Sequence, residues 1–152
     1  MSQQTSELVI RKSVTVAAPV EHAFRVFTEQ IGTWWPLRSH AIETEEAETV
    51  VMEGRAGGRL FERTKAGEEL VWGTIAAWDP PHRVVYSWHP GRGEETAQEV
   101  DVTFTAQGET TRVDVAHYGW EKLPGRLDET IASYHEGWDK VIGLYAQAAE
   151  RS

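Results

Sequence analysis

Cysteine is absent from this sequence of 152 residues, and proline (six) and methionine (two) are scarce. Without cysteine the chain has no disulfide, no thiolate zinc site and no cysteine nucleophile, which is consistent with a reducing compartment. No stretch approaches the roughly 18 consecutive apolar residues that span a bilayer. The polar segment from Met1 to Glu7 lacks the apolar run of a secretory signal. We therefore expect a cytoplasmic protein that has no membrane partner.

Positive charge is also scarce, because 15 basic residues face 24 acidic ones and the net charge is −9. Contacts between basic side chains and phosphate supply much of the affinity of proteins for nucleic acid. An acidic chain repels such partners, so we expect no nucleic-acid binding. The length and the 40% hydrophobic content predict a single domain over residues 1–152 with a sizeable core.

Sequence motifs for metal binding and for several kinds of catalysis are missing. The six histidines include no pair at the i, i+4 spacing and no His-Glu-x-x-His motif, so we predict no metal site and no cofactor. No Gly-x-Ser-x-Gly elbow is present, which argues against a hydrolase of that type. The glycine-rich segment 54–58 lacks the Lys-Ser/Thr ending of a phosphate loop and precedes a predicted strand, which favours a turn or bulge.

Hydrophobic spacing predicts an α+β chain. The expected order is a strand, two short helices, a run of antiparallel strands and a long helix, at residues 8–17, 19–27, 28–34, 49–53, 59–64, 69–78, 83–89, 100–105, 113–117 and 128–149. The long helix carries an apolar stripe that can cover the apolar face of a curved sheet. We expect the sheet to wrap around this helix, with the short helices holding the two apart at one end and leaving a cavity.

Short segments along nearly the whole chain resemble a known superfamily. They are 16–24 (VAAPVEHAF), 31–37 (IGTWWPL), 57–63 (GGRLFER), 72–75 (WGTI), 78–81 (WDPP), 84–88 (VVYSW), 117–120 (HYGW) and 137–138 (GW). Their order and spacing resemble the SRPBCC or START-like helix-grip superfamily, in the branch of the Hsp90 ATPase activator homologues. The resemblance implies a curved antiparallel sheet wrapped around a long C-terminal helix. Eukaryotic activators carry an additional N-terminal domain, so these residues correspond to the C-terminal-type domain only.

The superfamily includes lipid carriers, hormone receptors, polyketide cyclases and co-chaperones, so the resemblance implies three hypotheses for function. The first is binding of a small apolar or amphipathic molecule in a cavity between the sheet and the long helix, by a monomer or weak homodimer. The second is a cofactor-independent cyclase or hydratase that uses the same cavity. The third is a single-domain co-chaperone that acts through its surface. Fold alone does not choose among them, and enzymatic activity stays open.

Seven tryptophans are the most informative residues, because each offers a large apolar face and one N–H donor. Trp72, Trp88 and Trp138 lie on the predicted inward faces of two strands and the long helix. They form either a cavity wall or ordinary core. With the polar candidates discussed next, the predicted ligand-binding residues are Trp35, His40, Glu62, Trp72, Trp88, His117, Tyr134 and Trp138.

Two of the polar candidates are placed by strand alternation. His117 shares its parity with Val113 and Val115, which predicts an inward imidazole. It is either an acid–base group or a core histidine with satisfied nitrogens. Glu62 lies in the cavity if the row of Leu60 faces inward, where it would orient a ligand or act as a base.

The alternatives for the other polar candidates place them at the rim. Glu62 would otherwise form a rim salt bridge with Arg63 or a neighbouring residue. His40 follows the segment Trp34-Trp35-Pro36, and the resemblance places this loop near the cavity mouth. Otherwise His40 is a solvated loop histidine.

Overall fold

One antiparallel sheet carries most of the chain. The protein, seen here in a computed structural model, is described over residues 9–123 and 127–151. The strands are β1 Ile10–Val16, β2 Ala47–Met52, β3 Arg59–Thr64, β4 Glu69–Asp79, β5 Arg83–Trp88, β6 Gln98–Gln107 and β7 Thr110–Tyr118, in the spatial order β1-β7-β6-β5-β4-β3-β2. The helices are α2 Val20–Phe27 and α3 Leu127–Arg151, with 3-10 turns η1 Ile31–Thr33, η2 Glu94–Thr96 and η3 Trp120–Lys122.

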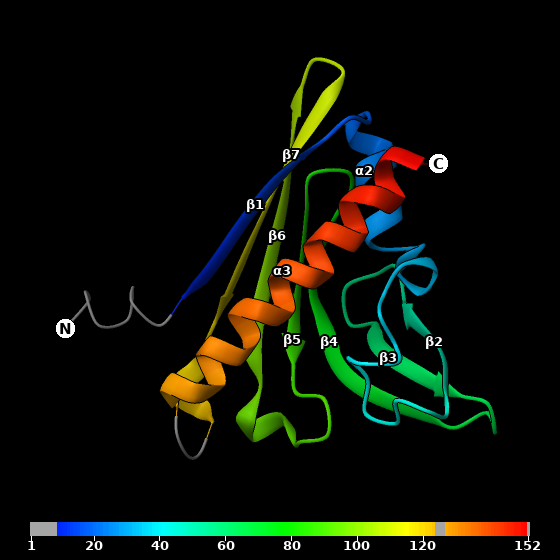
Figure 1. The fold of residues 1–152 in the computed structure, drawn as a ribbon, viewed down its shortest axis with the longest axis vertical. Helices are drawn as coiled ribbons and strands as arrows, with labels where there is room; N and C mark the ends of the chain where they lie inside the picture. Colours follow the sequence, from blue (N-terminus) through cyan, green and yellow to red (C-terminus); the bar gives the residue numbers. More distant parts are fainter. Residues whose placement is uncertain (1–8, 124–126, 152) are drawn as a thin grey trace.

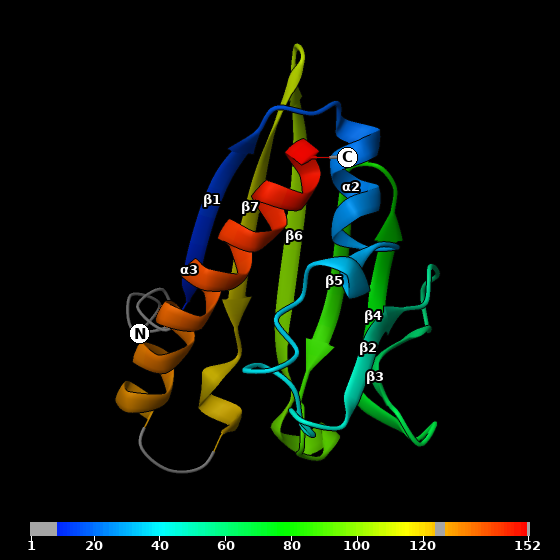
Figure 2. The same cartoon turned by 45° about the vertical axis from the view of Figure 1, so that its right-hand side comes forward.

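The sheet curls around the long helix α3. Figure 1 shows α3 lying diagonally across one face of the sheet, and Figure 2 shows the strands at the two sides of the sheet coming forward around it. This is the α+β helix-grip arrangement that the sequence predicts. Among the described residues, no helix combines the length and apolar character needed to cross a membrane.

Strands β6 and β7 show why the sheet has one apolar face. They form a hairpin at Gly108, whose φ of 68° is accessible to glycine at little cost. Their inward row consists of three opposed pairs, all at most 2% exposed: Val100 and His117, Val102 and Val115, and Phe104 and Val113. The outward partners between them are half-buried or exposed. This alternation confirms the inward direction predicted for His117.

The curl depends on a close approach between β4 and β5. A Cβ added to Gly73 would lie 1.8 Å from the carbonyl oxygen of Ser87, so a residue other than glycine does not fit there. The register shifts between Leu60 and Phe61 of β3, and again between Ile75 and Ala77 of β4. Such bulges bend a sheet, and Figure 2 shows β3 and β2 at the side of the sheet opposite β1.

Helix α2 fills one end of the space between the sheet and α3, which we call the closed end. Pro19 is its N-cap with ψ 157°, so the helix begins at Val20 and not at Pro19 as predicted. The apolar face of α2 buries Ala23, Phe24, Val26 and Phe27. The Tyr145 hydroxyl of α3 donates to the Ala23 carbonyl at 2.8 Å, which ties the two helices together.

Aromatic rings pack edge to face at the closed end. Phe24 contacts Phe104 with ring centroids 5.2 Å apart, and Phe27 contacts Tyr145 at 5.1 Å. Trp34, which follows η1, packs on Tyr145 at 5.5 Å, and its indole N–H donates to the Val26 carbonyl at 2.7 Å. These side chains are at most 6% exposed, so this end of the space is solid core.

Candidate functional site

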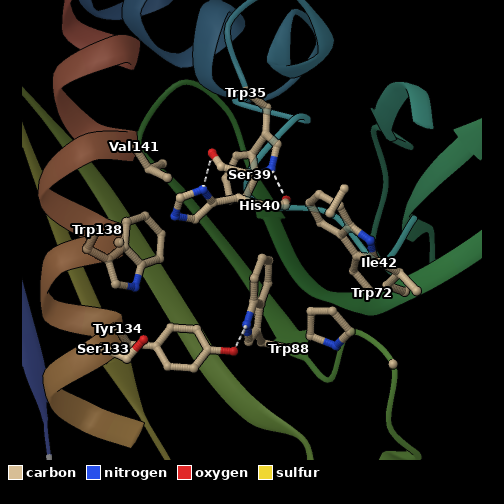
Figure 3. A pocket seen from close by; sticks show the side chains of 14 residues that line it. Trp35, Ser39, His40, Ile42, Trp72, Trp88, Ser133, Tyr134, Trp138 and Val141 are labelled. Atoms are coloured by element: carbon tan, nitrogen blue, oxygen red, sulfur yellow. Dashed lines mark hydrogen bonds between the residues drawn. The ribbon is translucent and has the colours of Figure 1, made fainter. Parts of the chain in front are cut away.

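The opposite end of the same space is hollow. A pocket of about 440 Å³, partly open to solvent, lies between the first half of α3, strands β4 and β5, and the loop after Pro36. Figure 3 shows its side chains converging from these elements. The lining residues are Trp35, Ser39, His40, Ala41, Ile42, Trp72, Trp88, Pro90, Gly91, Ser133, Tyr134, Gly137, Trp138 and Val141.

Six of the eight predicted site residues line this pocket: Trp35, His40, Trp72, Trp88, Tyr134 and Trp138. Several lining residues escaped the sequence analysis. Gly137 and Val141 lie three and seven positions after Tyr134 on α3, so the helical period was a signal that could have found them. Ile42, Pro90 and Gly91 come from loops and carry no periodic signal.

Three indole rings form a continuous wall. Trp72 lies 5.2 Å from Trp35 and 5.4 Å from Trp88, centroid to centroid, and Trp35 lies 5.9 Å from Trp88. Trp138 stands on α3 across the pocket from Trp72 (Figure 3). The four N–H groups all donate within the protein: Trp35 to the His40 carbonyl (2.6 Å), Trp72 to Glu62 Oε1 (2.6 Å), Trp88 to the Tyr134 hydroxyl (3.2 Å) and Trp138 to His117 Nδ1 (2.9 Å). The wall therefore offers ring surface and few free polar atoms.

Glu62 is buried with the row of Leu60, a question that the sequence left open, but among the described residues it is not part of the pocket lining. Its carboxylate accepts three hydrogen bonds, from Trp72 Nε1, from the backbone N–H of Ile42 at 2.6 Å and from that of Glu43 at 2.9 Å. Glu62 thus ties the loop after Pro36 to the pocket wall. The alternative of a rim salt bridge with Arg63 or a neighbour is wrong, because Glu62 is buried with N–H donors and Arg63 pairs with Glu69 at 3.3 Å.

His117 is fully buried behind Trp138, and it too lies outside the lining that the described residues form. Its Nδ1 accepts from Trp138, and its Nε2 lies 3.2 Å from Gln98 Oε1. The Gln98 amide N–H₂ donates to the Thr96 carbonyl at 2.7 Å, which leaves Oε1 to accept from His117. Burial lowers the pKa of His117 to about 3, so the ring is neutral at pH 7. The structure thus favours the alternative of a core histidine with both nitrogens satisfied.

His40 borders the pocket and is partly buried. Its Nδ1 lies 2.7 Å from Ser39 Oγ, and Lys140 Nζ of α3 donates to that oxygen at 3.0 Å. A Cβ on Gly137 would lie 3.4 Å from His40 Nε2, so the ring rests against the helix where it lacks a side chain. Burial and then the charge of Lys140 lower the pKa of His40. Ser39 and Lys140 were missed, because 101 positions separate them in the chain.

Trp78 lies elsewhere, with its ring 5.1 Å from Phe24 of α2. It borders a separate surface hollow together with Pro80, Pro81 and Gly54. In the part of the chain that the structure describes, no three His, Asp or Glu side chains gather in a way that could hold a metal ion. Among the described lining residues, the side chains with an ionisable group are those of His40 and Tyr134.

Comparison with known proteins adds the family. The model of the family described as "Activator of Hsp90 ATPase homolog 1-like protein" (AHSA1) matches residues 17–148. The chain belongs to the AHSA1 family. A search of curated proteins with this AHSA1 sequence gave no significant match.

Solved structures similar to this AHSA1 chain differ widely in their described roles. An anthrahydroquino-γ-pyrone synthase shares 36% identity, with 88% of this chain and 86% of that chain covered and a TM-score of 0.58. The self-sacrificing resistance protein CalC from Micromonospora echinospora shares 29% identity over 94% of each chain, with a TM-score of 0.72. The Aha1 dimer from Colwellia psychrerythraea shares 15% identity over 93% of this chain and 96% of that chain, with a TM-score of 0.68, and supports the fold alone.

Proposed function

We propose that this AHSA1 protein binds a small, planar, largely apolar molecule in the pocket between the sheet and α3. The observation that carries the proposal is the set of four indole rings around an open cavity, all with their N–H groups engaged inside the protein. Such walls contact a ligand through ring faces and edges, which favours flat aromatic partners. The cavity volume of about 440 Å³ lies within the range of roughly 300–1,000 Å³ typical of small-molecule sites.

The comparisons support this ligand class. The name of the 36% identical synthase denotes a reduced anthraquinone joined to a pyrone ring, which is a flat polycyclic product. That match covers 88% of this chain and 86% of the synthase. Burial of apolar area would supply most of the affinity, at roughly 25 cal/mol per Å².

Calorimetric titration with 2-methylanthraquinone tests the proposal. Trp138→Ala removes a pocket wall and Trp78→Ala removes a tryptophan outside it. We expect Trp138→Ala to weaken binding about tenfold or more, equivalent to about 1.4 kcal/mol, and Trp78→Ala to leave it nearly unchanged. Equal losses in the two variants would contradict the proposed pocket.

A second pair of variants avoids the core. Ser133 of α3 is exposed and belongs to the pocket lining. Its neighbour Ala132 is also exposed but lies outside the lining that the described residues form. Ser133→Trp fills the mouth and should abolish binding, whereas Ala132→Trp should preserve it. Native mass spectrometry of the protein purified from cells, compared with the denatured mass, then identifies the natural ligand as a mass excess that denaturation removes.

A cofactor-independent cyclase in the same pocket is the second candidate, favoured by the identity to a synthase. The sequence pointed to His117 or Glu62 as the acid–base group, but both are engaged by neighbouring protein groups. His40, at the pocket lining, takes that role in this proposal. Conversion of the recovered ligand by the protein, with a pH profile that His40→Gln alters, would support turnover.

A co-chaperone role is the third candidate, and the family's description as Hsp90 ATPase activator homologues favours it. It predicts stimulation of a bacterial Hsp90 ATPase by this chain. Because that role uses the outer surface, Ser133→Trp should leave the stimulation unchanged. Loss of stimulation in Ser133→Trp but not in Ala132→Trp would instead link the ATPase effect to the pocket.

A further inference from the structure

The described lining of the pocket contains no acidic side chain, although the protein is acidic. The chain carries 24 Asp and Glu residues, and none of them belongs to the lining that the described residues form. The one carboxylate close behind the wall, Glu62, is engaged by three N–H donors. A bound molecule therefore meets no carboxylate that would attract a cation or accept from an amine.

Tyr134 presents a donor to the pocket. The indole N–H of Trp88 can only donate, so the Tyr134 oxygen accepts in their 3.2 Å hydrogen bond. That bond occupies a lone pair and does not use the hydroxyl proton. The proton is then available to an acceptor atom of a ligand in the pocket that Tyr134 lines.

His40 also presents a donor, because of the groups behind it. Lys140 has only donors, so Ser39 Oγ accepts from it at 3.0 Å. The Ser39 hydroxyl then donates to His40 Nδ1 at 2.7 Å in preference to the Pro36 carbonyl at 3.4 Å. A neutral imidazole that accepts at Nδ1 carries its proton on Nε2.

The charge of Lys140 reaches the pocket through this chain of hydrogen bonds. Donation by an ammonium group polarises the Ser39 hydroxyl and, through it, the His40 ring. Lys140 is the charged group that acts on His40 from α3, whereas Asp139, next to it in sequence, pairs with Lys12 of β1 at 2.8 Å. In Figure 3, His40 Nε2 points toward α3 between Val141 and Trp138.

We propose that the pocket selects the ionised form of a planar phenol or enol, whose anionic oxygen accepts from His40 Nε2–H under the influence of Lys140. Tyr134, on another side of the pocket in Figure 3, donates to a second oxygen on a different edge of the same molecule. The proton lost on ionisation passes to solvent through the open mouth. This inference rests on the proposed function and names the chemistry of its ligand: an acceptor-rich phenolate or enolate, in preference to an amine or cation.

A matched pair of probes tests the inference. 2-Hydroxyanthraquinone ionises with a change in its visible spectrum, and 2-methylanthraquinone has the same shape without an ionisable group. We expect the protein to bind the ionised hydroxyl form about tenfold more tightly than the neutral form, which lowers the pKa of the bound probe by about one unit. The measurement is a spectrophotometric pH titration of the probe with and without saturating protein.

Three variants assign the effect. Lys140→Met should remove most of the shift in the probe's pKa while leaving the affinity for 2-methylanthraquinone unchanged. Ser39→Ala, at the pocket lining, should also remove most of the shift. Lys65→Met removes the same charge from the turn between β3 and β4, outside the pocket, and should preserve the shift. A role of Lys140 limited to stability would change the binding of both probes alike.

The outcomes separate the two proposals. If both probes bind and the pKa of the hydroxyl probe is unshifted or raised, the selection of an anion is wrong and the proposed function stands. An equal effect of Lys140→Met and Lys65→Met also overturns the relay and leaves the pocket in place. If neither probe binds, the proposed ligand class falls, and the inference falls with it.

Discussion

The two ends of the space between the sheet and α3 are built from the same kinds of side chain and have opposite properties. At the closed end, rings of Phe24, Phe27 and Tyr145 meet edge to face and fill the space. At the open end, indole rings stand around a cavity of about 440 Å³. The two ends differ because α2 lies between the sheet and α3 at the closed end, whereas the described residues place no second α-helix at the open end (Figure 1). Aromatic content alone therefore does not distinguish a core from a binding wall.

Two histidines near the open end, His117 and His40, also differ in whether they face the core or the cavity. His117 is enclosed, and both of its nitrogens have protein partners. His40 has one nitrogen engaged by Ser39 and lines the cavity with its ring. Burial lowers the pKa of both rings, so both are neutral at pH 7. A ring nitrogen that has no partner among the described residues, and not the pKa alone, makes a histidine available to a ligand.

Removal of the Glu62 carboxylate, which holds the loop at the open end, should lower the stability of the protein more than the other substitutions. Glu62→Ala leaves the N–H groups of Trp72, Ile42 and Glu43 without their acceptor, and we expect the free energy of unfolding to fall by about 3 kcal/mol. Glu69→Ala, which removes an exposed ion-pair partner of Arg63, is the control and should cost far less. Urea denaturation measures both, and similar losses would show that the Glu62 anchor contributes little.

Acid should destabilise the protein through His117. Its pKa is about 3 in the folded state and about 6.5 when unfolded, so between these values the unfolded state binds the extra proton. Stability is therefore fully present above pH 6.5 and falls as the pH decreases, by about 2 kcal/mol between pH 7 and pH 5. Denaturation curves at several pH values measure this slope. His117→Gln should flatten it, and an unchanged slope in that variant would assign the effect to other groups.

Matched tyrosine variants compare the two ends directly. Tyr145→Phe removes the buried hydrogen bond to the Ala23 carbonyl at the closed end and should cost about 1 kcal/mol, with no effect on probe binding. Tyr134→Phe at the open end should cost less stability and weaken the binding of 2-hydroxyanthraquinone. The measurements are thermal unfolding and calorimetric titration. The reverse assignment, with probe binding lost in Tyr145→Phe, would contradict the division into a core end and a binding end.

Two helix glycines should give the smallest effects. Gly143→Ala adds a methyl group where no atom lies within 4 Å, and it should stabilise α3 by up to about 1 kcal/mol. Gly137→Ala gains a similar helix preference, but its Cβ would lie 3.4 Å from His40 Nε2, at the pocket. We expect a comparable rise in thermal stability and weaker probe binding for Gly137→Ala alone. Equal binding by the two variants would show that the pocket tolerates a methyl group at this position.

Periodicity in the sequence predicts the fold and most of the pocket wall. Strand parity places Trp72, Trp88 and His117 inward, and the helical period places Tyr134 and Trp138 on one face of α3. These predictions succeed because a single apolar face dictates the direction of each element.

The hydrogen-bonding partners of the polar groups are what the sequence does not reveal. Parity places Glu62 in the same row as Leu60. It does not decide whether that row is buried or whether Glu62 holds the loop after Pro36, since a loop has no period. The contact of Lys140 with Ser39 joins a helix and a loop 101 positions apart. Such contacts depend on tertiary packing, and the alternatives for His117 and Glu62 stayed open for the same reason.

The anchoring of the pocket loop by Glu62 has a consequence for how this scaffold diversifies. The carboxylate holds the main-chain N–H groups of Ile42 and Glu43 and contacts neither of their side chains through those bonds. Substitutions at these positions therefore keep the anchor while changing the chemistry of the rim. Natural variation or directed evolution can therefore change ligand preference at the pocket mouth while the hydrogen bonds that hold this loop to Glu62 are kept.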